Sequence, residues 1–184
     1  MNSLEPPESH FLAAAQGWLE LGRQTEAKSE CENISMGFRN HPDVLEVLWN
    51  IHYLEQDWAA CVLVGSASVE AAPDRPLAWR HRSASLHFFG ETRSAYEKLL
   101  PALEEFPDEW SIRYDIACYA CSLGNQNEAR CQLKIAVELG DRFQNAFKFV
   151  NANAPAETVC VKQMALSDPD LQSLWHEIKR IWPP

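Results

Sequence analysis

The stretch LGNQNEA, residues 123–129, decides the fold, because its glycine and its alanine recur at a fixed interval along the chain. LGRQTEA occupies residues 21–27 and FGETRSA occupies residues 89–95. The position numbers of Ala95 and Ala129 differ by 34, and those of Ala27 and Ala95 differ by twice as much. The missing member falls at position 61, where Cys61 supplies another small side chain. The sequence therefore contains an internal repeat of 34 residues.

Apolar residues on both sides of the glycine predict two helices in each repeat. In the fourth repeat Ile112 and Ile116 precede Gly124, while Leu133 and Val137 follow it at helical spacing. Glycine suits the turn because the residue that ends a helix often takes a left-handed conformation. The small residue five positions later lets two antiparallel helices approach closely. Each repeat is thus expected to be helix, glycine turn, helix.

Several positions depart from the regular pattern. Gln56 stands where the second repeat would have its turn glycine, and Pro101 is expected to kink the second helix of the third repeat. Residues 143–150 resemble a further short helix, and residues 151–156 a loop. Ser167 or Asp168 can cap the last helix, with Pro169 in its first turn.

A 34-residue helix–turn–helix unit with an early Trp, a turn Gly, a small residue opening the second helix and a late Pro resembles the tetratricopeptide repeat (TPR). The third unit carries this pattern best, with Trp79, Gly90, Ala95, Ala102 and Pro107. The resemblance implies an all-α, right-handed α-solenoid (superhelix) of about four TPR units with C-terminal capping helices. It also implies that the first helices of the units line a concave groove.

The resemblance gives a domain organisation. Residues 1–8 are an N-terminal tail, and residues 9–142 hold four TPR-like repeats at about 9–41, 42–75, 76–109 and 110–142. Residues 143–184 are then C-terminal capping helices, and residues 165–175 are similar to the closing segment of bacterial members of the family. Such a lid is expected because the last repeat would otherwise expose apolar surface.

The groove of such a protein usually holds a peptide or a helix of a partner protein. Its candidate lining side chains come from the first helices of the second, third and fourth repeats: Glu46, Asn50, Tyr53, Arg80, His81, His87, Tyr114, Cys118 and Cys121. Family members that capture a C-terminal carboxylate use Lys and Asn at matched positions. This chain offers Glu46, His81 and Asp115 there, and only Asn50 matches, so a carboxylate clamp is not expected.

Composition narrows the class of partner. The formal net charge of -10 disfavours nucleic acid and anionic membrane surfaces, which need clustered Lys and Arg. No apolar run approaches the roughly 18 residues of a membrane span, and residues 1–8 do not resemble a secretory signal, so a cytoplasmic location is expected.

No nucleotide-binding, zinc-protease or serine-hydrolase motif is present, so the sequence indicates neither an enzyme nor a cofactor. A protein-interaction scaffold is the leading interpretation. Two alternatives stay open: a cytoplasmic chaperone for a secreted protein, and a redox or metal sensor that uses Cys118, Cys121 and Cys131. Packing cysteines are expected over a metal site, because a lone CxxC inside a helix is a weak signal. The oligomeric state stays open.

Overall fold

The computed structural model describes residues 4–150 and 160–181, and their side chains except those of 143–150 and 181. Every regular element in these ranges is helical. The chain divides into two compact units, Met1–Glu91 (unit 1) and Thr92–Pro184 (unit 2). This division falls inside the third expected repeat, between its two helices.

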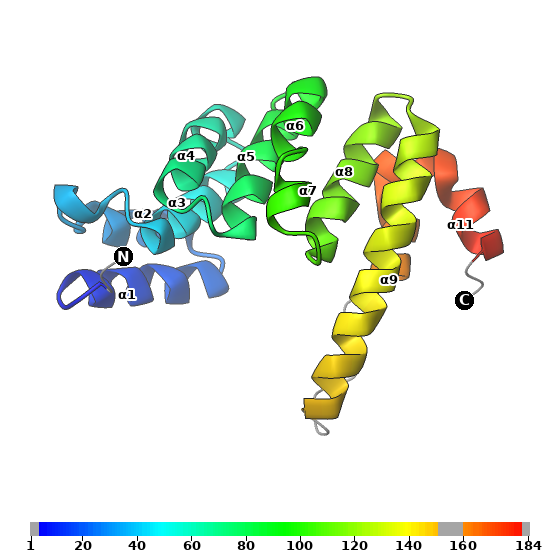
Figure 1. The fold of residues 1–184 in the computed structure, drawn as a ribbon. Coiled ribbons are helices and arrows are strands. Elements are labelled where there is room, and N and C mark those ends of the chain that lie inside the picture. The colour runs from blue at the N-terminus through cyan, green and yellow to red at the C-terminus, as the bar shows by residue number, and fades with distance from the viewer. Residues whose placement is uncertain (1–3, 151–159, 182–184) are drawn as a thin grey trace. The chain divides into compact units, whose positions relative to one another are not determined.

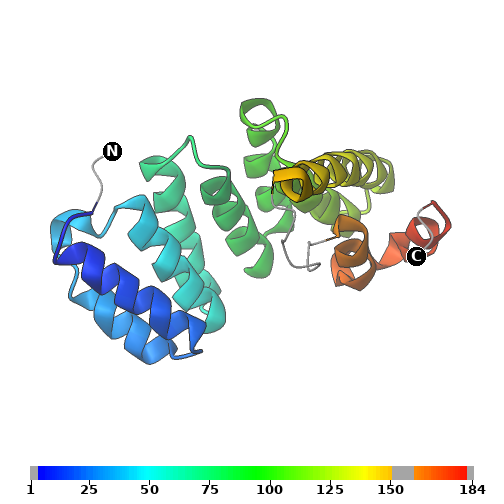
Figure 2. The same ribbon diagram turned by 90° about the horizontal axis from the view of Figure 1, so that it is seen from below.

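Unit 1 consists of two antiparallel helix pairs followed by a further helix (Figures 1 and 2). Its elements are α1 (Glu8–Glu20), α2 (Gln24–Glu32), the short 3-10 helix η1 (Met36–Phe38), α3 (Pro42–Leu54), α4 (Trp58–Ala71) and α5 (Pro76–Phe88). Small and branched apolar side chains fill the core between α1, α2 and α3, among them Ala15, Ala27 and Ile51, all fully buried. Helices α4 and α5 approach closely at Gly65, where an added Cβ would lie 2.8 Å from the Cα of Arg82. A larger side chain at this position would push the two helices apart.

All four turns between the paired helices have the same left-handed geometry, at the interval expected from the sequence. The turn residues have positive φ angles: Gly22 (69°), Gln56 (57°), Gly90 (94°) and Gly124 (81°). The amide of each turn residue donates to the carbonyl oxygen three residues earlier, at 2.9–3.1 Å. The next amide donates to the carbonyl oxygen five residues earlier, at 2.8–2.9 Å. These two bonds define a Schellman motif, which satisfies carbonyl groups at the end of a helix.

The small residue that follows each turn is fully buried. Ala27, Cys61, Ala95 and Ala129 all have 0% of their surface exposed. Close packing of the helices within the pairs α1–α2, α3–α4 and α8–α9 explains the small residues at positions 27, 61 and 129.

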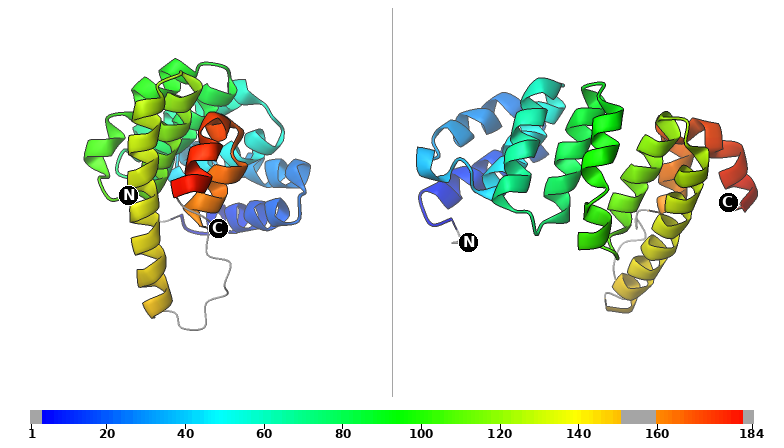
Figure 3. Two further views of the ribbon diagram at one scale, coloured as in Figure 1. Left: turned by 90° about the vertical axis from the view of Figure 1, so that its right-hand side faces the viewer. Right: turned by 45° about the horizontal axis from the view of Figure 1, so that its top comes forward.

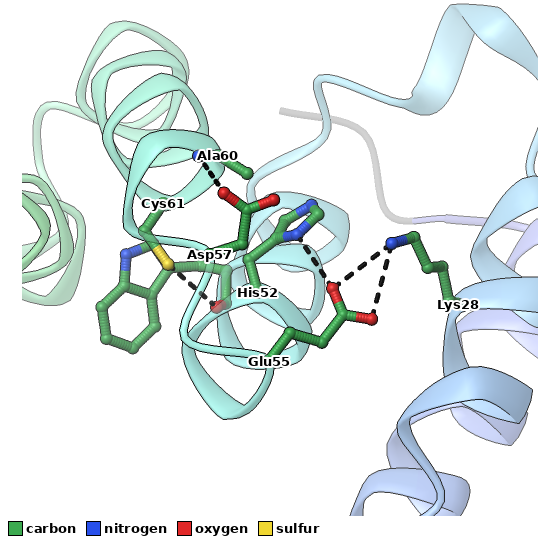
Figure 4. Close-up of polar contacts among 7 residues, drawn as sticks. Lys28, His52, Glu55, Asp57, Ala60 and Cys61 are labelled. Carbon is green, nitrogen blue, oxygen red and sulfur yellow. Dashed lines mark hydrogen bonds and ion pairs between the residues drawn. The ribbon is translucent and has the colours of Figure 1, made fainter.

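Contacts at the α3–α4 turn fasten the second pair to the first (Figure 4). Glu55 forms an ion pair with Lys28 of α2 at 3.3 Å and lies 3.4 Å from the half-buried imidazole of His52. Asp57 caps α4, since its side chain accepts a hydrogen bond from the amide of Ala60 at 3.1 Å.

Unit 2 comprises α6 (Thr92–Leu99), α7 (Ala102–Glu105), α8 (Trp110–Ser122), α9 (Gln126–Val150), α10 (Val161–Ser167), the 3-10 helix η2 (Pro169–Leu174) and α11 (Trp175–Ile181). The kink expected at Pro101 is a break between α6 and α7. The separate short helix expected at residues 143–150 is wrong, because α9 continues through them and runs well beyond the end of α8 (Figure 1). The loop expected at 151–156 lies outside the described residues.

The C-terminal helices pack beside α8 and α9 (Figure 3). Helix α10 meets α9 at Gly140, where an added Cβ would lie 2.5 Å from Cγ2 of Val161. Asp168 caps η2 by accepting the amide of Asp170 at 3.0 Å, and Pro169 occupies the first turn.

Candidate functional site

In unit 1 the candidate groove residues lie on α3 and α5. Glu46, Asn50 and Tyr53 follow one another at steps of four and three residues, so they share one side of α3. Glu46 and Asn50 are half-buried, and 37% of Tyr53 is exposed. On α5, Arg80 and His87 are half-buried. These five side chains remain partly open to solvent.

His81, a further candidate on α5, lies in the interior with 7% of its surface exposed. Its ring stacks on Trp49 with centroids 3.9 Å apart and planes at 5°. Trp49 is fixed in turn, because its indole nitrogen donates to Ser85 Oγ at 2.7 Å. Burial lowers the pKa of His81 to about 3, with Arg80 acting in the same direction, so the imidazole is neutral near pH 7. His81 is therefore a buried residue that packs against Trp49 and does not belong to the exposed part of α5.

Three aromatic rings emerge above this pair, and we call Tyr53, Trp58 and Phe88 the aromatic edge. Tyr53 stacks on Trp49 at 5.0 Å, so the edge continues the buried stack. The Trp58 and Phe88 rings stack at 4.9 Å, and Tyr53 meets each of them edge-on at 5.6 Å. Phe88 is 44% exposed.

Trp58 and Phe88 were not among the candidate residues found from the sequence. The repeat contained a usable signal for Phe88, because Phe88 and Leu54 are apolar residues one repeat interval apart. Trp58 carried no such signal, since its contribution depends on how the first turn of α4 packs against α5.

The unit that carries these aromatic rings is rich in carboxylates. Residues 1–91 contain 13 Asp and Glu against six Lys and Arg, a formal charge of -7. On α3, Asp43 forms an ion pair with Arg75 at 2.5 Å. Burial raises the pKa of Glu46, and Asp43 adds to this effect. We call the aromatic edge together with Glu46, Asn50, Arg80 and His87 the α3–α5 surface. It carries exposed aromatic rings and belongs to a unit with a negative formal charge.

In unit 2 the candidate groove residues Tyr114, Cys118 and Cys121 lie on α8 and are buried, with 5%, 4% and 8% of their surfaces exposed. Residues 168–174 of the same unit cover them. Tyr114 Oη donates to Asp168 Oδ2 at 2.8 Å, and Cys118 Sγ donates to the same oxygen at 3.5 Å. The expected groove positions of the fourth repeat are therefore occupied by the chain itself.

The environments of Cys31, Cys61 and Cys118 disfavour thiolate chemistry. Burial, together with nearby Asp168, Asp115 and Asp170, raises the pKa of Cys118, and burial raises the pKa of Cys31 and of Cys61 to about 11. A metal-ligating or nucleophilic cysteine needs the opposite shift. Residues 4–150 and 160–181 contain no group of three His, Cys, Asp or Glu side chains able to hold a metal ion.

Within the described part of the chain, no helix is both long and apolar enough to span a membrane. No protein-family model matches the sequence, and neither does any curated protein.

Solved structures do resemble this one. "Crystal structure of MamA" superposes with a TM-score of 0.67 at 13% identity, over 76% of this chain and 81% of that one. "MamA MSR-1 C2" gives 0.61 at 21% identity, over 72% and 76% of the two chains. "MamA RS-1 ArsTM double mutant" gives 0.65 at 16% identity, over 98% and 99%. MamA is a TPR-repeat protein. Together with the repeated helix pairs, these likenesses show that the chain has an all-α solenoid fold of the tetratricopeptide type.

Proposed function

We propose that the protein is a non-catalytic interaction module that binds a peptide or helix of a partner protein on the α3–α5 surface of unit 1. The observation that carries this proposal is the aromatic edge. Tyr53 and Phe88 expose 37% and 44% of their surfaces while resting on a ring stack that continues into the core. Aromatic side chains held rigidly in this way lose little entropy on binding and are frequent anchors of protein interfaces.

The neighbouring side chains supply polar contacts around these rings. Glu46 and Asn50 continue the side of α3 that bears Tyr53, and Arg80 and His87 come from α5. The formal charge of -7 over residues 1–91 favours a segment that carries basic residues beside an apolar or aromatic anchor. The buried thiols of α8 make a redox or metal sensor a weaker alternative.

The test is capture of partners from a lysate of the native host by the tagged full chain, quantified by mass spectrometry. The variant Tyr53→Ala/Phe88→Ala removes two rings of the aromatic edge. Leu63→Ala is the matched control, because Leu63 is a 74% exposed apolar residue on α4. Circular dichroism of all three proteins checks that the helices persist.

We expect specific partners to be enriched by the native protein and by Leu63→Ala, and to fall at least about tenfold with the double variant, as for loss of an interface anchor. An unchanged set of partners with the double variant would show that this surface does not bind them.

A further inference from the structure

The positions that α8 presents to residues 168–174 are the fourth repeat's counterparts of the α3–α5 surface. Tyr114, Cys118 and Cys121 lie two repeat intervals after Glu46, Asn50 and Tyr53. Ser122 corresponds in the same way to Leu54. We call Tyr114, Cys118, Cys121 and Ser122 the α8 face. In a repeat protein, equivalent positions occupy equivalent places on each helix pair.

Residues 168–174 contact every member of the α8 face through polar groups. Beyond the two bonds to Asp168, Ser122 Oγ donates to Asp170 Oδ1 at 3.2 Å, and Cys121 Sγ lies 3.1 Å from Ser173 Oγ. Two apolar anchors accompany these bonds: Leu171 is 0% exposed and Leu174 is 2% exposed. Peptides that bind in a groove make polar side-chain contacts of this kind.

The two oxygens of Asp168 have separate roles. Oδ1 accepts a hydrogen bond from the amide of Asp170 and so caps η2. Oδ2 accepts hydrogen bonds from Tyr114 Oη and Cys118 Sγ. Burial raises the pKa of both donors, so the phenol and the thiol keep their protons and continue to donate. The α8 face thus binds the carboxylate of Asp168 through uncharged hydrogen-bond donors.

Covering the end of the solenoid does not account for these contacts. Helix α10 supplies such cover, because its buried Val161 lies in the space left by Gly140 of α9. Leu171 and Leu174 add apolar cover, whereas the groups that contact the α8 face directly are two carboxylates and a hydroxyl.

We propose that residues 168–174 are a built-in ligand of the α8 face, and that a protein segment with two carboxylates spaced as in Asp-x-Asp, followed by an apolar residue, competes with them. This inference rests on the proposed function, since it treats the α8 face as a binding surface of the same kind. The resident segment is tethered, so it acts at a high effective concentration and keeps weak competitors out.

The first test releases the segment without disturbing its helix cap. Asp168→Asn keeps an oxygen for the Asp170 amide but replaces the acceptor of Tyr114 and Cys118 with an amide group that donates. Hydrogen exchange, read by mass spectrometry, is expected to rise about tenfold or more in residues 169–175 with little change in α8 and α9, as for loss of hydrogen bonds to a charged group. An equal rise in α8 and α9 would make the segment a permanent part of the core and overturn the proposal.

The second test supplies the ligand from outside. The probe is a fluorescein-labelled peptide of residues 166–176, LSDPDLQSLWH, titrated into the full-length chain and followed by polarisation. We expect saturable binding to Asp168→Asn and binding at least about tenfold weaker to the native protein, whose own segment competes. Adding Tyr114→Phe to Asp168→Asn is expected to weaken binding about tenfold, whereas the control addition Tyr96→Phe, on α6, leaves it unchanged.

Equal binding to the native and Asp168→Asn proteins, or none to either, would overturn the inference. That failure is separate from failure of the proposed function, because the peptide titration involves only unit 2. If Tyr53→Ala/Phe88→Ala loses its partners while the peptide never binds, the proposed function stands and the built-in ligand does not.

Discussion

The turn at Gln56 offers a direct test of how the repeat is built. Its φ of 57° is left-handed, which costs a residue with a Cβ about 1–2 kcal/mol. Replacing Gln56 with glycine removes this strain but gives the unfolded chain extra freedom worth about 0.5–1 kcal/mol. The side chain is exposed, so little packing is lost. We therefore expect Gln56→Gly to raise the free energy of unfolding by about 0.5–1 kcal/mol.

Urea unfolding followed by circular dichroism measures this change, and a rise in Tm of roughly 1–4 °C should accompany it for a chain of this length. Hydrogen exchange should slow in α3 and α4 more than in α8 and α9, since the turn belongs to unit 1. Gln56→Ala is the matched control: it removes the same side chain but keeps the Cβ and therefore the strain. If Gln56→Ala stabilises the protein as much as Gln56→Gly, the gain comes from the side chain, and backbone strain at this turn is refuted.

Three further predictions concern buried groups. The pKa of His81 falls from 6.5 to about 3 in the folded protein, so the stabilisation from the neutral imidazole is complete above pH 6.5 and is lost as the pH falls toward 3. The free energy of unfolding should therefore fall by about 2 kcal/mol between pH 8 and pH 5 because of His81. Urea unfolding of the native protein and of His81→Phe at the two pH values measures this loss. Exposed Cys131 should react with a thiol reagent such as DTNB well before buried Cys61, so Cys131→Ser should remove one thiol from the fast phase, to which half-buried Cys160 can contribute as well; a fast phase of unchanged amplitude would contradict the burial pattern. Gly65→Ala should destabilise unit 1 by about 1–2 kcal/mol, because the added Cβ would overlap the backbone of α5. Gly17→Ala, with open space around the position, should stabilise α1 by up to about 1 kcal/mol. Thermal unfolding compares the two variants, and equal shifts in Tm would contradict the close approach of α4 and α5 at Gly65.

The helix pairs could be predicted from the sequence because small buried residues recur at a fixed interval. The left-handed turn at position 56 was visible only through that interval, since Gln carries no preference for positive φ. The hydrogen bonds of this turn are nevertheless the same as those of the three glycine turns.

The surfaces were less accessible to prediction. His81 shares a helix with Arg80, and helical spacing alone could not show that its ring would stack inside on Trp49. Cover of Tyr114 and Cys118 by Asp168 joins residues far apart in the sequence, and local periodicity says nothing about such pairs. The length of α9 was missed because the repeat interval suggested a stop after residue 142, whereas residues 143–150 contain neither Gly nor Pro and continue the helix.

The uncharged donors of the α8 face have a consequence for ionic strength. A phenol or thiol in contact with a carboxylate is attracted as a dipole at short range, so dissolved ions weaken this attraction little. The nearby contact between α9 and α11 is different, because Arg130 and Glu177 form a partly exposed ion pair at 2.6 Å, which salt screens. Rising salt should therefore loosen α11 before it loosens η2, so that the C-terminus detaches from its end inward.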